Sequence, residues 1–411
     1  MEKITVVDSI MGSGKTSWAI QYMNEADDSE KFIYITPFLA EVERVKSSVT
    51  KRTFFEPNNA NGDGRKMTSL KDLIVNGEDI TSTHSLFQTA DDELIELLRD
   101  SGYTLILDEV MDCVEPVNIK KLDIKRLLAN GDIEIVDNNV RWIGDENDDS
   151  RYSDICVLAR AGNLYYHRGK FLVWAFPPSV FRVLDKAYVM TYLFSAQMQR
   201  YYFDLFAFDY EYKSVKEVDG RYELTQYEKG KENREALYSL IDIYDGKMNE
   251  LGKRKNALSA TFLRNANVEV LQEIRNNLYN FFQNVAKAKR HEVYFSTLKK
   301  VEVVVAPRGY KEPRKKASES KKEVCISLNA RATNDYADRR AIAYIYNRYN
   351  NPHINSFFQD NGVSIDENLL AVSDLLQWIW RSQIRNGEPI QLYLPSSRMR
   401  GLLQQWAKYE I

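Results

Sequence analysis

Residues 9–16, Ser-Ile-Met-Gly-Ser-Gly-Lys-Thr, constrain the fold of this chain more than any other segment. They follow the β-rich run Ile4–Asp8 and precede a helix-like run that begins at Ser17. A strand, a glycine-rich loop and a helix in this order form a phosphate-binding loop, whose backbone N–H groups surround the β-phosphate at the positive end of the helix dipole. The motif G-x-x-x-x-G-K-[ST] is complete except for Ser9 at the first glycine. The sequence therefore predicts that the chain binds a nucleoside triphosphate.

The loop assigns a role to each of its polar residues. Lys15 is expected to reach the β- and γ-phosphates, and Thr16 is expected to ligate Mg²⁺. An ordinary glycine-rich turn is the alternative interpretation, which the strand before and the helix after disfavour. The full set predicted to contact the nucleotide is Met11, Gly12, Ser13, Gly14, Lys15, Thr16 and Ser17.

Composition narrows the class of protein. The 411 residues suffice for two or three domains, and 44% hydrophobic residues are ordinary for a globular chain. No apolar run approaches membrane-spanning length, and the immediate first strand leaves no room for a signal peptide, so we expect a cytoplasmic protein. A net charge of -3 argues against a protein that coats nucleic acid. The spacing of Cys113, Cys156 and Cys325 predicts reduced thiols rather than a zinc site.

Strands and helices alternate along the first half of the chain. This pattern predicts a parallel sheet, with ligands at the carboxyl ends of the strands. The predicted strands are Lys31–Ile35, Asp79–Thr83, Tyr103–Leu107 and Ala187–Leu193, and the predicted helices are Leu39–Ser48 and Asp91–Arg99. Two β-hairpins, within an insertion at about 131–176, are expected to decorate this domain.

The second half begins with a charged segment and then returns to α/β character. We expect a helical insertion at about 228–290 and an exposed basic loop at 311–322, which is either a solvated surface segment or a nucleic-acid contact. The later predicted strands are 324–328 and 390–394, and helices are predicted from Asp338 and Leu369.

An apolar strand in the first half ends in two adjacent acids, Asp108 and Glu109. In a parallel sheet this places both carboxylates at the same edge as the phosphate-binding loop. Asp108 is expected to hold Mg²⁺ through water, and Glu109 to act as the general base that polarises the attacking water. Acids are common at strand ends, but together with the loop the pair indicates hydrolysis of the nucleotide.

With these motifs the chain resembles the superfamily 2 helicases and translocases, in particular the small DEAD/DEAH-like helicases of bacteriophages. Residues 34–45 resemble motif Ia and residues 80–84 the next backbone-contacting motif. Residues 108–111, Asp-Glu-Val-Met, are similar to motif II but depart from DEAD and DEAH at the last two positions. The resemblance implies that the nucleic-acid backbone is contacted by Thr36, Pro37, Thr83 and His84.

Residues 189–193 are similar to motif III, which links the nucleotide site to the nucleic-acid cleft. Thr191 is the hydroxyl implied to provide this coupling, with Ser195–Gln197 as the competing alignment. Ordinary strand-loop packing is the alternative for each of these segments. Some relatives recognise adenine with a glutamine motif upstream of the loop, and we expect no such motif here. ATP is therefore expected only because the family generally uses it.

Residues 377–385 in the second half resemble motif VI, Q-x-x-G-R-x-x-R. Gln377, Arg381 and Arg385 are spaced by four, so one helix face would present both guanidinium groups to the γ-phosphate. Such cations would neutralise charge in the transition state and couple hydrolysis to domain closure. The alternative is an amphipathic helix with Trp378 and Trp380 in the core and both arginines in solvent.

Residues 327–335 follow a predicted strand and resemble motif V. The resemblance implies that Arg331, Thr333 and Asn334 contact phosphates of the nucleic acid. A polar loop that caps the next helix is the alternative.

The fold class expected from the resemblance is α/β, with two RecA-like P-loop NTPase domains at 1–212 and 213–411. The expected function is an ATP-dependent DNA helicase or translocase of phage replication or recombination, in which Mg²⁺ and ATP lie between the domains. DNA is expected as the partner in preference to RNA. One rival is a terminase-like packaging ATPase, which would carry clustered nuclease acids in place of the late arginines. The other rival is an ATP-gated loading or remodelling factor that hydrolyses ATP without unwinding.

Overall fold

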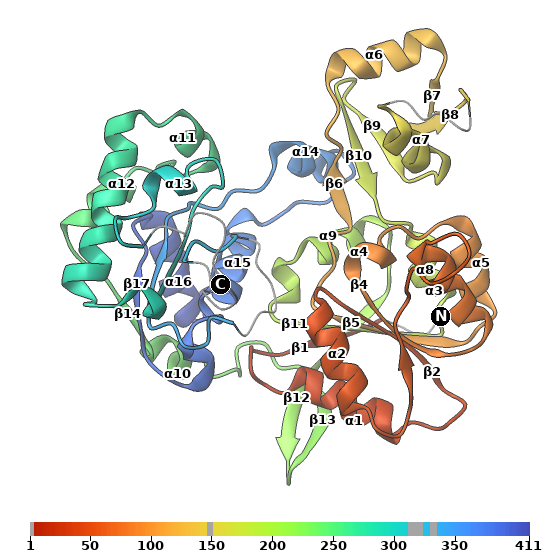
Figure 1. Ribbon diagram of the computed structural model, residues 1–411, viewed down its shortest axis with the longest axis horizontal. Coiled ribbons are helices and arrows are strands. Elements are labelled where there is room, and N and C mark those ends of the chain that lie inside the picture. Colours follow the sequence, from red (N-terminus) through yellow and green to blue (C-terminus); the bar gives the residue numbers. More distant parts are fainter. Residues whose placement is uncertain (1–3, 146–150, 311–323, 329–334) are drawn as a thin grey trace. The chain divides into compact units, whose positions relative to one another are not determined.

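The computed structural model describes residues 4–145, 151–310, 324–328 and 335–411. The chain forms two compact units, each described here by itself (Figure 1). The first unit comprises Met1–Tyr227 with Asn351–Ile365, and the second comprises Glu228–Asn350 with Asp366–Ile411. The N-terminal segment of the first unit therefore ends at Tyr227 rather than at residue 212, and residues 351–365 also belong to this unit.

An eight-stranded sheet forms the centre of the first unit, in the order β13-β12-β1-β11-β5-β2-β4-β3. All neighbouring strands are parallel except β12 and β13, which form an antiparallel hairpin at one edge. The strands are β1 (Ile4–Asp8), β2 (Lys31–Thr36), β3 (Phe54–Phe55), β4 (Asp79–Thr83), β5 (Tyr103–Asp108), β11 (Lys186–Thr191), β12 (Tyr210–Val218) and β13 (Arg221–Gln226). The predicted parallel sheet is confirmed.

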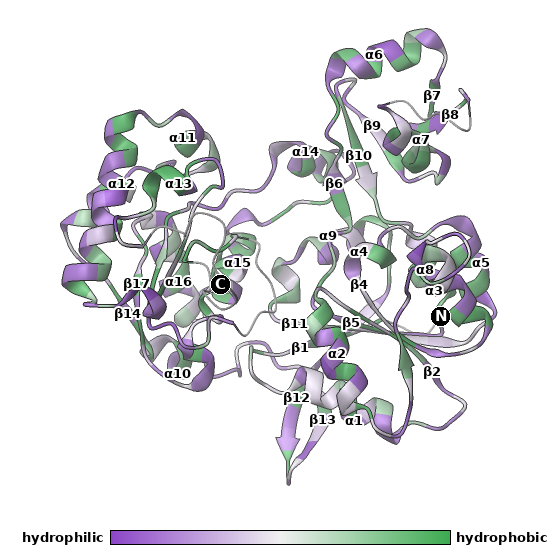
Figure 2. Ribbon diagram, viewed as in Figure 1, coloured by the Kyte–Doolittle hydropathy of each residue, from purple (hydrophilic) through white to green (hydrophobic). Residues whose placement is uncertain are grey.

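Helices cover both faces of this sheet. Successive side chains of each strand point to opposite faces, and both faces carry apolar side chains that the helices bury. Val7 packs with Trp18 on one face, and its neighbour Val6 lies in the cluster of the other face. The central strands are mostly hydrophobic between their ends, whereas the surface helices carry both hydrophilic and hydrophobic residues (Figure 2). The helices are α1 (Lys15–Glu25), α2 (Leu39–Ser48), α3 (Lys66–Val75), α4 (His84–Phe87), α5 (Asp92–Arg99), α8 (Pro178–Val183), η1 (Phe194–Ala196), α9 (Met198–Leu205) and α14 (Pro352–Asp360).

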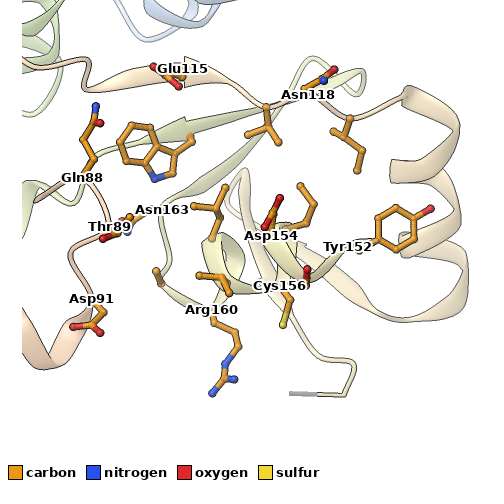
Figure 3. A pocket seen from close by; sticks show the side chains of 18 of the residues that line it. Gln88, Thr89, Asp91, Glu115, Asn118, Tyr152, Asp154, Cys156, Arg160 and Asn163 are labelled. Carbon is orange, nitrogen blue, oxygen red and sulfur yellow. The ribbon is translucent and has the colours of Figure 1, made fainter. Parts of the chain in front are cut away.

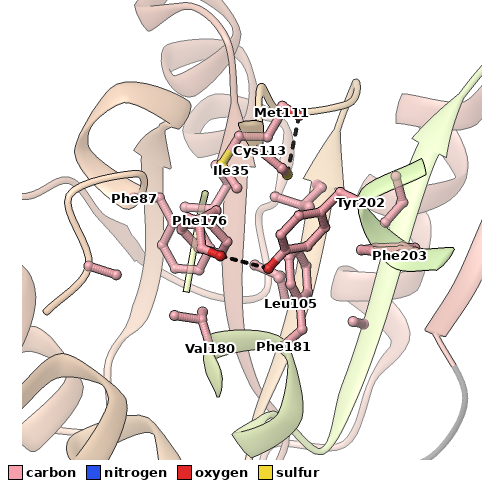
Figure 4. Packing of buried hydrophobic residues seen from close by; sticks show 14 of the residues in the cluster. Ile35, Phe87, Leu105, Met111, Cys113, Phe176, Val180, Phe181, Tyr202 and Phe203 are labelled. Carbon is pink, nitrogen blue, oxygen red and sulfur yellow. Dashed lines mark hydrogen bonds between the residues drawn. The ribbon is translucent and has the colours of Figure 1, made fainter. Parts of the chain in front are cut away.

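Aromatic side chains from α8 and α9 fill the larger apolar cluster of the first unit (Figure 4). The buried Tyr202 hydroxyl donates a hydrogen bond of 2.9 Å to the carbonyl of Phe176, so its polar end is satisfied inside the core. The Cys113 Sγ lies 3.4 Å from the carbonyl of Met111. Cys113 and Cys156 are buried and Cys325 is half-buried, and no disulfide joins them.

A second, five-stranded antiparallel sheet is inserted between β5 and β11, in the order β6-β10-β9-β8-β7. Both predicted hairpins lie in this sheet, but the insertion starts at Val114 rather than near residue 131. Its own small core packs two helices on the strands. The elements are β6 (Val114–Pro116), α6 (Lys121–Asn130), β7 (Ile133–Val136), β8 (Asn139–Trp142), α7 (Ser153–Arg160), β9 (Leu164–His167) and β10 (Phe171–Ala175).

The helix α14 belongs to the first unit although it comes late in the sequence. Phe357 and Phe358 are buried in the larger cluster, where the Phe358 ring lies 6.3 Å from that of Tyr201. Asp360 forms a two-pronged ion pair with Arg168 of the inserted sheet, at 2.6 Å for each oxygen. The helix therefore fastens the inserted sheet and α9 together.

The second unit is built on a four-stranded parallel sheet in the order β14-β17-β16-β15. The strands are β14 (Ile241–Ile243), β15 (Val293–Ser296), β16 (Ala341–Tyr344) and β17 (Ile390–Tyr393). The helices are α10 (Arg234–Ser239), η2 (Lys247–Gly252), α11 (Ala260–Asn265), α12 (Val268–Asn280), η3 (Phe281–Val285), η4 (Arg290–Glu292), α13 (Glu302–Val305), α15 (Glu367–Ile379), η5 (Gln383–Asn386) and α16 (Ser397–Ala407).

Three expectations for the second unit need correction. The segment 228–290 is not only helical, because β14 within it pairs with β17. The strand predicted at 324–328 is reduced to a single bridge between Cys325 and Phe295. The helix predicted from Asp338 is wrong, since a turn there leads into β16, whose apolar run is buried on both faces. The predicted basic loop, 311–322, lies outside the described residues.

In the described part of the chain, no helix combines the length and the apolar composition needed to cross a membrane.

We expect Phe358→Ala to destabilise the first unit by about 3 to 5 kcal/mol, because it empties a buried aromatic site. The loss should appear as faster native-state amide exchange in α9, and as a lower denaturant midpoint. The neighbouring exposed residue supplies the control, Gln359→Ala, which should change stability by no more than about 0.5 kcal/mol. Unchanged exchange in α9 would show that α14 is dispensable for the first unit.

Candidate functional site

The loop between β1 and α1 has the backbone that phosphate binding requires. Gly12 and Gly14 have φ values of 80° and 92°, in the left-handed region that glycine adopts without strain. α1 begins at Lys15, so the N–H groups of its first turn have no partner within the helix. The side chain of Lys15 folds over the loop, where its Nζ donates to the carbonyls of Ser9 at 2.7 Å and Ile10 at 3.2 Å.

The structure gives a reason for Ser9 in place of the first glycine. Its hydroxyl accepts a hydrogen bond of 2.8 Å from the backbone N–H of Val215 in β12. Its own N–H donates to the carbonyl of Thr191 in β11. Ser9 thus links the start of the loop to both strands that flank β1, and a glycine at this position would lack the hydroxyl that bonds β12.

Asp8, the last residue of β1, anchors the segment that follows β11. Its buried carboxylate accepts hydrogen bonds of 2.9 Å from the backbone N–H groups of Leu193 and Phe194. Leu193 has a φ of 54°, which is strained for a branched residue and is held in place by these bonds. The predicted motif III segment and the phosphate-binding loop therefore share one rigid base.

Asp108 lies at the carboxyl end of β5 and is 8% exposed. The hydroxyl of Tyr34 donates a hydrogen bond of 2.7 Å to its Oδ2. Burial, assisted by the charge of Glu109, raises the pKa of Asp108 to about 7, and the bond from Tyr34 opposes the rise only in part. Asp108 is therefore poised to lose its proton when a cation approaches.

Glu109 has a φ of 66°, a conformation that is costly for a residue with a side chain and that concentrates at functional sites. Its backbone N–H donates to the carbonyl of Met190 in β11. The hydroxyl of Thr191 donates a hydrogen bond of 3.3 Å to its Oε2. The structure thus brings together the predicted general base and the predicted coupling residue.

The ammonium group of Lys15 lies within the field of these acids. Burial lowers its pKa, and the charges of Glu109, Asp8 and Asp108 oppose that shift. One cation beside several carboxylates at the loop is a suitable environment for a metal-bound triphosphate.

These residues fit a nucleotide bound with Mg²⁺. The hydroxyl of Ser13 is buried and has no hydrogen-bond partner among the described residues, so it is available to a phosphate oxygen. No group of three or more metal-binding side chains occurs in the described ranges. Mg²⁺ does not require such a group, because it keeps several waters and takes one or two protein ligands together with phosphates. Thr16 and Asp108 remain the candidate ligands.

The residues predicted to contact nucleic acid are only partly accessible. Thr36 and Thr83 are paired at the carboxyl ends of β2 and β4. The side chains of Thr36 and His84 are buried, whereas Pro37 and Thr83 are partly exposed at the same edge. Three further predictions, Arg331, Thr333 and Asn334, lie outside the described residues.

The motif VI residues do not share one helix face, so this prediction is wrong. α15 ends at Ile379, because Ser382 adopts an extended conformation and its hydroxyl donates to the Ile379 carbonyl at 2.7 Å. Gln377 is in the helix, Arg381 follows it, and Arg385 lies in η5. All three belong to the second unit.

The alternative interpretation, an amphipathic helix with both tryptophans in the core and both arginines in solvent, is also only partly correct. Trp378 is fully buried and donates from Nε1 to the Ser296 hydroxyl at 2.7 Å, but Trp380 is half-buried. Arg381 is 5% exposed rather than in solvent, and its charge opposes the burial-driven rise in the pKa of Tyr294. Arg385 is the more accessible of the two arginines.

A cavity of about 1400 Å³ lies elsewhere in the first unit, between the start of α5 and the inserted sheet (Figure 3). Its lining includes Asp91, Asp154 and Arg160, but no residue of the loop, Asp108 or Glu109. Six acidic and three basic side chains line it, and this balance disfavours a polyanion. The cavity is therefore separate from the candidate nucleotide site and poorly suited to nucleic acid.

The pKa of Asp108 predicts a specific dependence of stability on pH. Between the ordinary value of 3.8 and about 7 the folded chain holds one more proton than the unfolded chain, so the free energy of unfolding falls as pH rises through this window. The total cost above it is at most about 4 kcal/mol, at about 1.4 kcal/mol per unit. Without Mg²⁺ and nucleotide, Asp108→Asn should therefore be more stable than the unmodified chain at pH 8 and not at pH 4.

Urea unfolding of both proteins at the two pH values, followed by amide exchange in β5, measures this difference. The exposed Asp28 provides the control, because Asp28→Asn should leave the pH dependence unchanged. A stability difference between Asp108→Asn and the unmodified chain that is equal at both pH values would contradict the assignment.

Comparison with solved structures supports the architecture. The fold is similar to that of a structure titled XPD helicase, with a TM-score of 0.52 and 12% identity, covering 99% of this chain and 94% of that chain. Xpd4 of S. tokodaii gives a TM-score of 0.51 and 12% identity over 100% and 94% of the two chains. At this identity the likeness concerns the fold alone, and it confirms the prediction of two RecA-like domains.

Sequence comparisons identify the family. The family described as YonV middle domain matches residues 114–174, which is the inserted sheet, and the YonV C-terminal Rossmann-like domain matches residues 235–407. The chain is 37% identical over 418 residues to the SPbeta prophage-derived protein YonV of Bacillus subtilis (strain 168), covering 99% of each. The protein belongs to the YonV family.

Proposed function

We propose that this protein is an ATP-dependent DNA helicase or translocase that acts in phage DNA replication or recombination. The observation that carries the proposal is the hydrogen bond between Thr191 and Glu109 beside the phosphate-binding loop. This bond connects Glu109, which is proposed to activate water, with Thr191, which is proposed to respond to nucleic acid at the end of β11. The helicase-like fold and the prophage origin of the relative support the same assignment.

In the proposed reaction the first unit supplies most of the chemistry. Lys15 releases the carbonyls of Ser9 and Ile10 and turns to the β- and γ-phosphates, which offer it a stronger, charged acceptor. Glu109 accepts the proton of the attacking water. Mg²⁺, held by Thr16 and by Asp108 through water, would neutralise charge on the phosphates.

Thr191 is proposed to couple this chemistry to the nucleic acid. Its hydroxyl orients the Glu109 carboxylate, and the next residues are fixed to Asp8 at the base of the loop. A shift of this segment on nucleic-acid binding would therefore move the general base directly. We propose that nucleic acid lies along the sheet edge where Pro37 and Thr83 are accessible. The alternative function is a factor that loads or remodels nucleic acid without unwinding it.

A cation from the second unit is proposed to complete the site. Of the two candidates, the greater accessibility of Arg385 favours it over Arg381 for reaching a phosphate, and the burial of Arg381 favours a structural role. Gln377 is proposed to assist from α15.

We expect Glu109→Gln to lower the rate of nucleic-acid-stimulated ATP hydrolysis by about a hundredfold or more while ATP binding is retained, because the amide cannot accept the proton. Lys15→Ala should abolish binding as well. Glu96→Gln, an exposed glutamate on α5, should leave both unchanged. Steady-state hydrolysis and equilibrium nucleotide binding measure the two effects. Normal hydrolysis in Glu109→Gln would rule out the proposed base.

Strand displacement, movement along single strands and stimulated hydrolysis, each measured with the same variants, distinguish three kinds of protein. Displacement that disappears in Lys15→Ala and Glu109→Gln supports a helicase. Stimulated hydrolysis with movement along single strands but no displacement supports a translocase. Stimulated hydrolysis without either would identify the loading factor.

We expect Arg385→Ala to lower the hydrolysis rate by about a thousandfold with nearly unchanged ATP affinity, since an arginine finger acts in the transition state. Arg308→Ala, at an exposed site of the same unit, is the control and should have no effect. Arg381→Ala should instead lower the denaturant midpoint, because the guanidinium is buried. Single-turnover hydrolysis and urea unfolding test the pair, and full activity in Arg385→Ala would remove it from the site.

A further inference from the structure

The β12–β13 hairpin brings an aromatic ring to the phosphate-binding loop. A Cβ added to Gly14 would lie 2.1 Å from Cε1 and 2.6 Å from Cδ1 of Tyr222, so the ring occupies the space beside the bare backbone of this glycine. Tyr222 is half-buried, with part of its side chain packed on the cluster around Trp18. The remainder of the side chain is exposed.

Polar contacts hold the hairpin at this position. Gln21 of α1 binds the backbone of Tyr222 twice, by accepting from its N–H at 3.0 Å and donating to its carbonyl at 3.2 Å. One turn further along α1, Glu25 pairs with Arg221 through both carboxylate oxygens, at 2.7 and 2.6 Å. Gln21 thus holds the backbone of Tyr222 itself, and the exposed Glu25–Arg221 ion pair adds a second link between the hairpin and α1, so the ring is in place before a nucleotide binds.

The order of the strands shows which end of a nucleotide the ring would meet. Asp108 ends β5 and Glu109 follows it, and the two mark the side of the loop where the γ-phosphate is expected. β13 lies on the other side of β1, since the order is β13-β12-β1-β11-β5. A triphosphate that extends from Lys15 toward β5 leaves its ribose and base on the side of the hairpin.

We propose that Tyr222 is the base-contacting residue of the nucleotide site, with its ring stacked on the base or ribose of the bound nucleoside triphosphate. The inference rests on the proposed function and adds a contact from outside the phosphate-binding loop. Stacking uses the π face that every base offers, so it gives affinity without reading base identity. Tyr222 therefore favours nucleoside triphosphates over inorganic triphosphate, and it accepts purines and pyrimidines alike.

Calorimetric binding of Mg-ATP and of Mg-tripolyphosphate to the full chain tests the proposal. Tyr222→Ala should weaken ATP binding about tenfold and leave tripolyphosphate binding within about twofold, because only ATP carries a base. Tyr222→Phe keeps the ring and should bind ATP as the unmodified chain does. Leu224→Ala perturbs the same face of the hairpin without touching the ring, and should leave both affinities unchanged.

Three results would overturn the inference. Equal weakening of both ligands in Tyr222→Ala would mean that the ring only supports the loop. Tighter binding of either ligand would mean that the ring covers the phosphate site, and unchanged ATP binding would mean that it touches no nucleotide. If the unmodified chain and Lys15→Ala bind neither ligand, the proposed function itself fails, which is a different result from a defect confined to Tyr222.

Discussion

The buried carboxylate of Asp8 is the interaction on which the candidate site depends. It accepts two backbone hydrogen bonds from the turn after β11, and an intramolecular hydrogen bond typically contributes about 0.5 to 1.5 kcal/mol. Through them the phosphate-binding loop and the Thr191 segment are held in one frame. Ser9 extends this frame to β12, from which the hairpin with Tyr222 continues. The site is thus assembled around the end of a single central strand.

Most of the first unit could be predicted from the sequence because its signals are local. The helix Leu39–Ser48 and the strand Asp79–Thr83 have the predicted bounds, since apolar periodicity and the flanking turns determine them. The roles proposed for Glu109 and Thr191 came from motifs far apart in the chain, and the structure places their side chains in contact. In the second unit the same rules failed at Asp338 and at Arg381. There a short buried strand and a serine that ends a helix override the periodic pattern.

Other parts of the site carry no local signal. In the sequence, Tyr34 looks like one more core residue of a buried strand. Only the pairing of β2 with β5 brings its hydroxyl to Asp108. Tyr222 lies 208 positions after Gly14, and its contact depends on a hairpin added at the edge of the sheet. Pairings over such separations follow from the three-dimensional register, which a single sequence does not encode in any short window.

The return of the chain at α14 has a consequence for how the protein can be divided. The backbone passes between the two units three times, after Tyr227, after Asn350 and after Ile365. A shortened chain that stops at Tyr227 would lack Phe357 and Phe358 and leave the ring of Tyr201 uncovered, an exposed apolar surface of the kind that promotes aggregation. One proteolytic nick at any single crossing would give two fragments, at least one of which contributes to both units. Because of this late helix, no single cut of the chain can yield two fragments that coincide with the two units, although their sheets are distinct.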